Sequence, residues 1–523
     1  MAEALRLGKR VRLLLGRAAR DCHVVLLLAM CAAYAVAMSA VSIDNHDRFY
    51  NGAFDAGIYD QAVWLLSRGR APFATVEGMN VFGDHAQFIL LLVAPLYRAW
   101  DSIGVLYVLQ SVALAAGAIP LYFIAKDKFN NKWIPFAFVA SYLLYPALLW
   151  TNLENFHPVS FAVPLLFSAF YFLTKKKYGL FLATVALLLI TREELAFTTA
   201  ALGAFAFFKY DRKVGAATVA ASLAWGFVCM YSILPYFGGF GYFIKRPFAF
   251  AIHGTGVAEV LTNIAQNPGR LSAALFRGQN AEYLFKLSVP TAFLSLLSPE
   301  TLFLAAPGLV INLLSGWWYM HSIEYHYTYA IIPFVFISAV YGAARLRDFM
   351  LSRNRKFGRL FAVPLAVVVL ASLACNNTFG PYPTSVGNVS MLVSTIINFG
   401  KQDSRTALMD EAVGLVPPGA SVSAAYLFVP HLTHREIVYM FPNPFRESYW
   451  GAMLGNYTPP TPTVDADYVL LDNTVAPQDM HMMNTLVDRQ VYLKIFQRED
   501  VIVMKRNRSV AYDRGILGNN TDI

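Results

Sequence analysis

The chain has 523 residues, of which 57% are hydrophobic and only 14% are charged, and its mean hydropathy is +0.46. Soluble domains carry about 25% charged residues, so this composition excludes an ordinary soluble protein and predicts one that crosses a membrane several times. A net charge of +9 would suit nucleic acid in a soluble protein, but here most basic residues fall in loops between apolar segments. We therefore expect no nucleic-acid partner.

Apolar segments follow one another from residue 23 to residue 375, and a membrane span needs about 20 such residues. We predict a mainly α-helical, multi-pass membrane domain over 23–375, preceded by a basic cytoplasmic N-terminus at 1–22. The first segment continues well past Cys31, so we expect a span and not a cleavable signal peptide. About eleven spans are predicted, at 23–42, 103–125, 133–150, 158–174, 178–191, 194–208, 214–236, 283–297, 299–318, 325–344 and 359–375.

Lysine and arginine in the loops predict the orientation, because cytoplasmic loops are enriched in them. The prediction requires that segment 85–100 does not cross the membrane; it is short and contains Pro95, so we expect a re-entrant or interfacial helix. The loop 43–102 and the C-terminal region then lie outside the cell membrane. The basic clusters assigned to the cytoplasm are 1–22, 126–132, 175–177, 209–213 and 345–359.

The character of the sequence changes at residue 376, where turn residues and scattered charges replace the apolar runs. We predict a soluble, extracytoplasmic α/β domain over 376–523, with buried strands near 421–426 and 467–472 and a hairpin formed by 491–496 and 501–505. N-x-S/T sequons occur in this region at Asn376, Asn388, Asn456, Asn507 and Asn519, in keeping with an external location.

Ionisable residues near the predicted spans gather on the predicted external side. Such groups are costly near lipid and usually face a cavity or one another. Asp55 and Asp60, in the aromatic segment 54–64, are the candidate catalytic residues. This set suits either carboxylate general-base chemistry or ion coupling in a transporter. The candidate substrate-binding residues are Asp84, His85, Glu154, His157, Arg192, Glu193, Glu194, Glu324 and His326.

Several motifs together resemble a large prokaryotic family of uncharacterised predicted membrane proteins that is grouped with the GT-C glycosyltransferases. The resemblance covers most of the chain, including 421–424 and 429–435. It implies a GT-C fold that uses a polyprenyl-phosphate-linked sugar donor on the external face and a glycan, lipid or protein acceptor. It also implies inverting transfer, with Asp55 as the base. The motifs are Phe54–Trp64, Gly83–Tyr97, Asn155–Pro158, Thr191–Glu194, Ser298–Glu300 and Glu324–Tyr327.

Alternatives remain open at this point. GT-C members often carry adjacent acidic residues, whereas Asp55 and Asp60 have four residues between them, so either one is a candidate base, and a divalent cation shared between them is a further alternative. Asp55 would also suit a helix cap. His321, Glu324 and His326 have the residue types of a metal site, but we favour substrate binding and predict no certain cofactor. A transporter or flippase, or a non-catalytic scaffold, is the alternative function.

Overall fold

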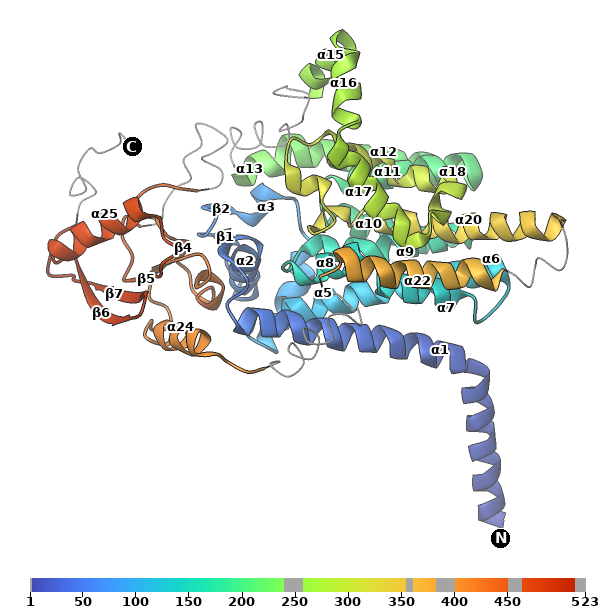
Figure 1. Ribbon diagram of the computed structural model, residues 1–523, viewed down its shortest axis with the longest axis horizontal. Coiled ribbons are helices and arrows are strands. Elements are labelled where there is room, and N and C mark those ends of the chain that lie inside the picture. Colours follow the sequence, from blue (N-terminus) through green and yellow to red (C-terminus); the bar gives the residue numbers. More distant parts are fainter. Residues whose placement is uncertain (1, 239–256, 354–360, 382–399, 450–462, 513–523) are drawn as a thin grey trace.

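The computed structural model describes residues 2–238, 257–353, 361–381, 400–449 and 463–512. It consists of a long helical bundle and a smaller C-terminal domain that lies at one end of the bundle (Figure 1). Residues 48–100, part of the loop predicted to be the first external segment, lie between them. The bundle helices are α1 (Ala2–Asp47), α5 (Gly104–Ala116), α6 (Ala118–Phe129), α7 (Pro135–Leu143), α8 (Pro146–Leu153), α9 (Ala162–Thr174), α10 (Tyr178–Leu189), α11 (Leu195–Lys209), α12 (Arg212–Val228), α13 (Leu234–Gly238), α17 (Gly278–Ser288), α18 (Pro299–Leu302), α19 (Ala306–Leu314), α20 (Ile332–Arg353) and α22 (Ala362–Phe379).

The expectation of about eleven spans is not supported. Within the described residues, four helices are long and apolar enough to cross a membrane, or five if the pair α7 and α8, bent by 42°, forms one span. Four further apolar helices of the described residues are shorter. One of them, α10, has 12 residues, which rise only about 18 Å against a hydrocarbon core of about 30 Å. The four long stretches are Cys22–Asp47, Gly104–Phe129, Arg212–Gly238 and Ala362–Phe379.

Two predicted spans are interrupted by other local structure. Segment 283–297 contains the end of α17 and two short 3-10 helices, η6 (Val289–Thr291) and η7 (Leu294–Leu297). Segment 325–344 contains η10 (His326–Thr328) before α20 begins. Pro290 lies in η6 and Pro333 at the start of α20, in line with the absence of an N–H that a helix interior would need. Apolar composition alone therefore overestimated the number of spans.

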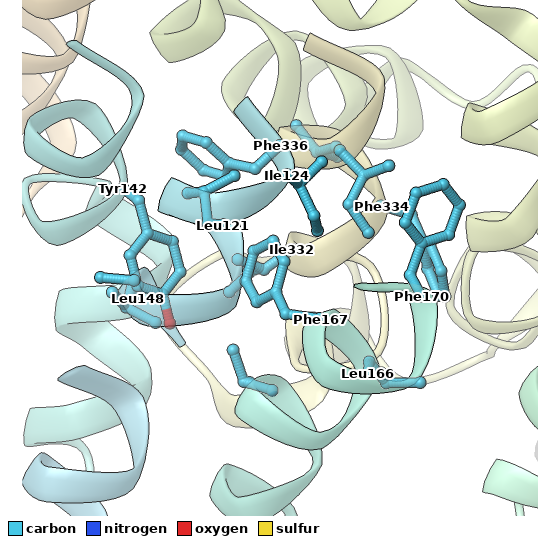
Figure 2. Close-up of a cluster of buried hydrophobic side chains, with 14 of the residues drawn as sticks. Leu121, Ile124, Tyr142, Leu148, Leu166, Phe167, Phe170, Ile332, Phe334 and Phe336 are labelled. Atoms are coloured by element: carbon cyan, nitrogen blue, oxygen red, sulfur yellow. The ribbon is translucent and has the colours of Figure 1, made fainter. Parts of the chain in front are cut away.

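Large aromatic and aliphatic side chains fill the centre of the bundle (Figure 2). Buried tyrosines there satisfy their hydroxyls on backbone carbonyls: Tyr142 donates to Leu114 O at 2.6 Å and Tyr145 donates to Leu287 O at 2.7 Å. Such pairing removes the cost of burying a polar group. The labelled core residues come from α6, α7, α8, α9 and α20: Leu121, Ile124, Tyr142, Leu148, Leu166, Phe167, Phe170, Ile332, Phe334 and Phe336.

The end of the bundle that carries basic residues lies opposite the C-terminal domain. Lys126 and Lys128 are in the last turn of α6, and Arg353 is in the last turn of α20. Both helices run toward the end away from the C-terminal domain (Figure 1). The assignment of the basic end to the cytoplasm stays a prediction from the loop charges.

The predicted external segment at 48–100 consists of short elements. They are η1 (Ala53–Gly57), α2 (Ile58–Ser67), the hairpin β1 (Phe73–Ala74) and β2 (Met79–Asn80), α3 (Val81–Asp84), α4 (Leu90–Val93) and η2 (Ala94–Arg98). Neither α4 nor η2 is long enough to cross the membrane, as expected for segment 85–100. α3 lies against α13, and a Cβ on Gly83 would be only 2.4 Å from the backbone nitrogen of Gly238.

The C-terminal domain contains a five-stranded sheet of order β4-β3-β5-β7-β6. β3 (Val422–Ala424) pairs in parallel with β4 (Val438–Met440) and β5 (Tyr468–Leu471), while β7 (Val501–Arg506) is antiparallel to β5 and β6 (Tyr492–Arg498). The predicted strands and closing hairpin are thus present, whereas β4 was not predicted. Helices α24 (Ser404–Gly414) and α25 (Pro477–Asp488) accompany the sheet, which is a mixed α/β arrangement.

Helix α2 joins the bundle to the C-terminal domain. Gln61 donates from Nε2 to Thr75 Oγ1 at 2.9 Å and to the carbonyl oxygen of Glu436 at 3.1 Å. Thr75 in turn donates to Val438 O, at the start of β4, at 2.6 Å. Gln61, Thr75 and Val438 are buried, so these three residues form a closed hydrogen-bonded contact between the two parts.

Candidate functional site

Asp55 lies in a strained turn at the end of the bundle that faces the C-terminal domain. Its backbone torsions are φ 60° and ψ −71°, close to those of the rare classic γ-turn. A non-glycine residue in such a region costs about 1–3 kcal/mol and persists only where the surroundings enforce it. Asp55 is the last residue with non-helical torsions before Gly57 and α2, so a helix-cap role stays an alternative for it.

Three other candidate residues converge beside Asp55. The carboxylate oxygen Oε2 of Glu154 is 3.1 Å from Nε2 of His157 and 3.2 Å from Nδ1 of His326. The two imidazole rings stack with centroids 3.6 Å apart. On the other side of the ring, Nδ1 of His157 is 3.8 Å from Oδ1 of Asp55. The side chain of Asp55 is 35% exposed, whereas that of His157 is 1% exposed.

Neighbouring backbone fixes these side chains. Pro158 disfavours a helical conformation for the preceding residue, and His157 is accordingly extended, with φ −135° and ψ 127°. Gln110 of α5 accepts from His157 N at 2.8 Å and donates to Asn155 O at 2.7 Å. Asn51 donates to Asn155 Oδ1 at 2.7 Å and so ties the turn that carries Asp55 to the same loop.

The electrostatics of this group are strongly coupled. Burial alone would raise the pKa of Glu154, but His157 and His326 together hold it well below its ordinary value. Burial alone would lower the pKa of His157, but Glu154 and Asp55 raise it. Burial and the adjacent His157 lower the pKa of His326 to about 3. His157 therefore holds a proton more readily than His326.

Arg192, Glu193 and Glu194 form a second group on the turn between α10 and α11. Nη2 of Arg192 donates to Nε2 of His85 at 2.9 Å, so Nδ1 of His85 carries the hydrogen that bonds Glu193 Oε1 at 2.7 Å. Glu193 also accepts from the backbone N–H of Ala86 at 3.0 Å. Burial would raise the pKa of Glu193, but His85 and Arg192 lower it to about 2.

Arg192 connects this second group to the first. Its Nε is 3.5 Å from Glu194 Oε2, and Tyr329 donates to Glu194 Oε1 at 2.5 Å. The charge of Arg192 also contributes to the low pKa of His326 and opposes the raised pKa of His157. Sequence reasoning missed Tyr329, because a single tyrosine in an aromatic-rich segment carries no distinguishing pattern.

Asp60 has a different setting from Asp55. It is 1% exposed and accepts hydrogen bonds from Tyr97 at 2.5 Å and from Thr433, while Nε2 of His434 lies 3.3 Å away. Burial would raise the pKa of Asp60, but His434 outweighs it and lowers the pKa. Thr433 and His434 belong to the C-terminal domain, so Asp60 lies in the interface between the two parts.

The remaining candidates are Asp84, which belongs to the Arg192 group, and Glu324, which belongs to neither group. Asp84 is the last residue of α3, with Oδ2 3.7 Å from Nε2 of His85, and it belongs to the second group. Glu324 is exposed, and in the described part of the chain its side chain has no hydrogen bond or ion pair with either group. His321 contacts Ser315 O at 2.9 Å instead. The structure thus brings together all the predicted site residues except Asp60 and Glu324.

An apolar hollow of about 320 Å³ lies on the flank of the bundle near these groups. Ile89, one of the lining residues, is bonded to the turn that carries Arg192, because its backbone N–H donates to Ile190 O at 2.9 Å. Its lining comes from α4, η2, α5, η3 (Pro158–Phe161), α9 and α10: Ile89, Leu92, Val93, Leu96, Leu109, Phe161, Pro164, Leu165 and Leu187.

Long apolar helices, a charged cluster at one end and a covering β-containing domain define an integral membrane protein of the multi-pass class. The chain belongs to the family described as "Predicted membrane protein (DUF2079)", whose model matches residues 45–494. This confirms the uncharacterised membrane family expected from the motifs. A comparison with curated proteins found no match.

Proposed function

We propose that this protein is an integral-membrane glycosyltransferase that transfers a sugar from a polyprenyl-phosphate donor to an acceptor hydroxyl or amide on the extracytoplasmic face. The observation that carries the proposal is the exposed Asp55 carboxylate, held in a strained turn beside the buried groups of His157 and Glu154. A general base must reach its substrate, and strain of this kind gathers at functional sites.

Asp55 is a better base than Asp60 on two grounds. Asp60 is 1% exposed and has partners from both parts of the protein, so an acceptor would have to displace them. Asp55 retains 35% exposure. A carboxylate with open access removes a proton from an incoming hydroxyl without prior rearrangement of the interface.

The remaining groups supply charge and a place for the lipid. Arg192 is a fixed cation within the cluster and favours a nearby anionic phosphate. The apolar hollow is lined by segments that adjoin His85, His157 and Arg192, and it suits isoprenoid units of a donor chain. A charged head beside an apolar path is the combination that a lipid-phosphate sugar requires.

In the proposed step the acceptor oxygen or nitrogen attacks the anomeric carbon as Asp55 takes its proton. The bond between the anomeric carbon and the phosphate oxygen breaks, and polyprenyl phosphate leaves with that electron pair. Attack opposite the leaving group inverts the anomeric configuration. Positive charge from Arg192 stabilises the phosphate as its charge increases.

The test is transfer of radiolabelled sugar from a polyprenyl-phosphate donor by protein reconstituted in liposomes with membrane extract as acceptor source. Asp55→Asn keeps the size of the side chain but cannot take a proton, and we expect transfer to fall at least about 100-fold. Asp127→Asn is the matched control, since Asp127 pairs with Lys175 at the basic end of the bundle. Equal transfer by both variants, or sugar translocation without transfer, would reject the proposal.

A further inference from the structure

We propose that Glu154, His157 and His326 bind one Zn²⁺ ion, or a divalent first-row transition metal with the same ligand preference. The site is distinct from a cation shared by Asp55 and Asp60, and from a set built on His321 and Glu324. It goes beyond the proposed glycosyl transfer and does not depend on it.

The positions of the ligand atoms carry the inference. One ligand atom from each residue lies within 4.8 Å of the other two, and the two separations from Glu154 Oε2 are 3.1 Å and 3.2 Å. Zinc bonds of about 2.0–2.2 Å place neighbouring ligand atoms about 3.3–3.6 Å apart in tetrahedral geometry, slightly more than these two separations. The carboxylate of Glu154 thus lies at ligand spacing from both imidazoles, whereas the stacked rings must rotate before both nitrogens face one ion.

The hydrogen bonding of His157 supports coordination over a simple ion pair. Nε2 of His157 is buried and 3.1 Å from the Glu154 carboxylate, but the two atoms are poorly aligned for a hydrogen bond, whereas Nδ1 of His326 does form one with Oε2 at 3.2 Å and would exchange it for the metal. Close approach without a shared hydrogen is the relation between two ligands of one ion. An ordinary imidazole–carboxylate pair would align the N–H with the oxygen.

Asp55 lies close to the position of the outer partner that a metal-bound histidine needs, at a separation longer than a hydrogen bond. Nδ1 of His157 is 3.8 Å from Asp55 Oδ1, on the side of the ring away from Glu154. Histidine ligands characteristically donate their second ring N–H to a carboxylate, which fixes the tautomer. Asp55, His157 and the ion would then form a carboxylate–histidine–metal relay, with Asp55 as a positioning residue for the metal.

A backbone hydrogen bond fixes the Glu154 carboxylate at the proposed metal site. Oε2 of Glu154 accepts from the backbone N–H of His326 at 3.1 Å, so the α8 terminus and the η10 segment are joined at the site. Two imidazoles and one carboxylate favour zinc and similar ions over Mg²⁺ and Ca²⁺, which prefer oxygen ligands. Three protein ligands also leave a position for a phosphate or a water molecule.

The experiment measures metal binding by the full-length protein in lipid nanodiscs, without a histidine tag. After chelation and dialysis, the protein is loaded with Zn²⁺, Mg²⁺ or Ca²⁺ and its metal content is measured by mass spectrometry. We expect about one Zn²⁺ per chain and no retained Mg²⁺ or Ca²⁺. Glu154→Gln and His157→Gln should each lose Zn²⁺, and Asp55→Asn should weaken its affinity about 10- to 100-fold.

His321→Gln is the matched control, because His321 is also buried but contacts only Ser315 in the described residues; it should bind Zn²⁺ like the wild type. His326→Cys keeps a ligand and adds sulfur, so its Co²⁺ form should gain a thiolate charge-transfer band that the wild type lacks. Absence of Zn²⁺ from the wild type, equal retention by the ligand variants, or absence of that band would overturn the metal site. A metal-free protein with Asp55-dependent transfer would refute this inference alone, whereas a zinc protein without transfer would refute only the proposed function.

Discussion

Removal of the Asp60 carboxylate should loosen the contact between the bundle and the C-terminal domain. Asp60→Ala leaves Tyr97 OH, Thr433 Oγ1 and His434 without their shared acceptor inside a closed interface. Loss of one partner from a buried pair costs about 3–5 kcal/mol. That cost corresponds to an increase of about 150- to 5,000-fold in the open population of the interface.

Hydrogen–deuterium exchange in nanodiscs measures this opening directly. Exchange at Gln61 in α2 and at Val438 in β4 should accelerate together, because both lie in the same hydrogen-bonded contact. Asp101→Ala is the control, since Asp101 also lies within 3.3 Å of His434 but is half exposed; its effect should be below about 1 kcal/mol. If Asp60→Ala exchanges like Asp101→Ala, Asp60 does not hold the two parts together.

Three further outcomes are expected. Burial would raise the pKa of Asp60, but His434 lowers it, so the contribution of Asp60 to stability is present above about pH 3.9 and is lost as the pH falls through the folded-state pKa. Burial would lower the pKa of His434, but Asp60 and Asp101 raise it, with Arg68 acting against them. The contribution of His434 to stability is therefore complete below about pH 6.5 and is lost as the pH rises through the raised pKa. Protection of the interface should therefore be greatest between about pH 4 and 6.5, and a flat exchange profile over pH 3–9 would contradict this. Gly83→Ala should reduce the melting temperature by several degrees, since its Cβ would overlap the backbone of Gly238; an unchanged melting curve would show that α3 and α13 separate freely. Leu165→Trp, which narrows the apolar hollow, should raise KM for a long-chain donor more than for a short-chain one, and equal KM changes would place the lipid chain elsewhere.

Local patterns in the sequence predicted much of the secondary structure. The apolar run at 467–472 and the closing hairpin became β5, β6 and β7, because short buried segments bounded by turns favour strands. β4, at Val438–Met440, was not predicted, although it is as long as the predicted β3. The span count failed because hydropathy does not reveal where a helix breaks, as at η6 and η10.

The sequence predicted which residues belong to the candidate site, but not which of them contact one another. Loop charges predicted that Glu154, His157 and Arg192 share one end of the bundle, and the described structure does bring them near His326. Their pairing depends on tertiary contacts that no local pattern encodes. The same limit applies to Asp60, whose partner Thr433 is 373 positions away in the chain. From sequence alone, Asp55 was the favoured base and Asp60 remained a second candidate.

The proposed function requires that the Asp55 site cleaves a lipid-phosphate sugar. Release of free polyprenyl phosphate tests it most directly, because this product forms whichever sugar or acceptor is used. Purified protein in liposomes would be supplied with a panel of polyprenyl-phosphate sugars and an acceptor extract, and the released lipid phosphate quantified by mass spectrometry. We predict acceptor-dependent release by the wild type and by Asp127→Asn but not by Asp55→Asn; release that persists in Asp55→Asn would contradict the claim.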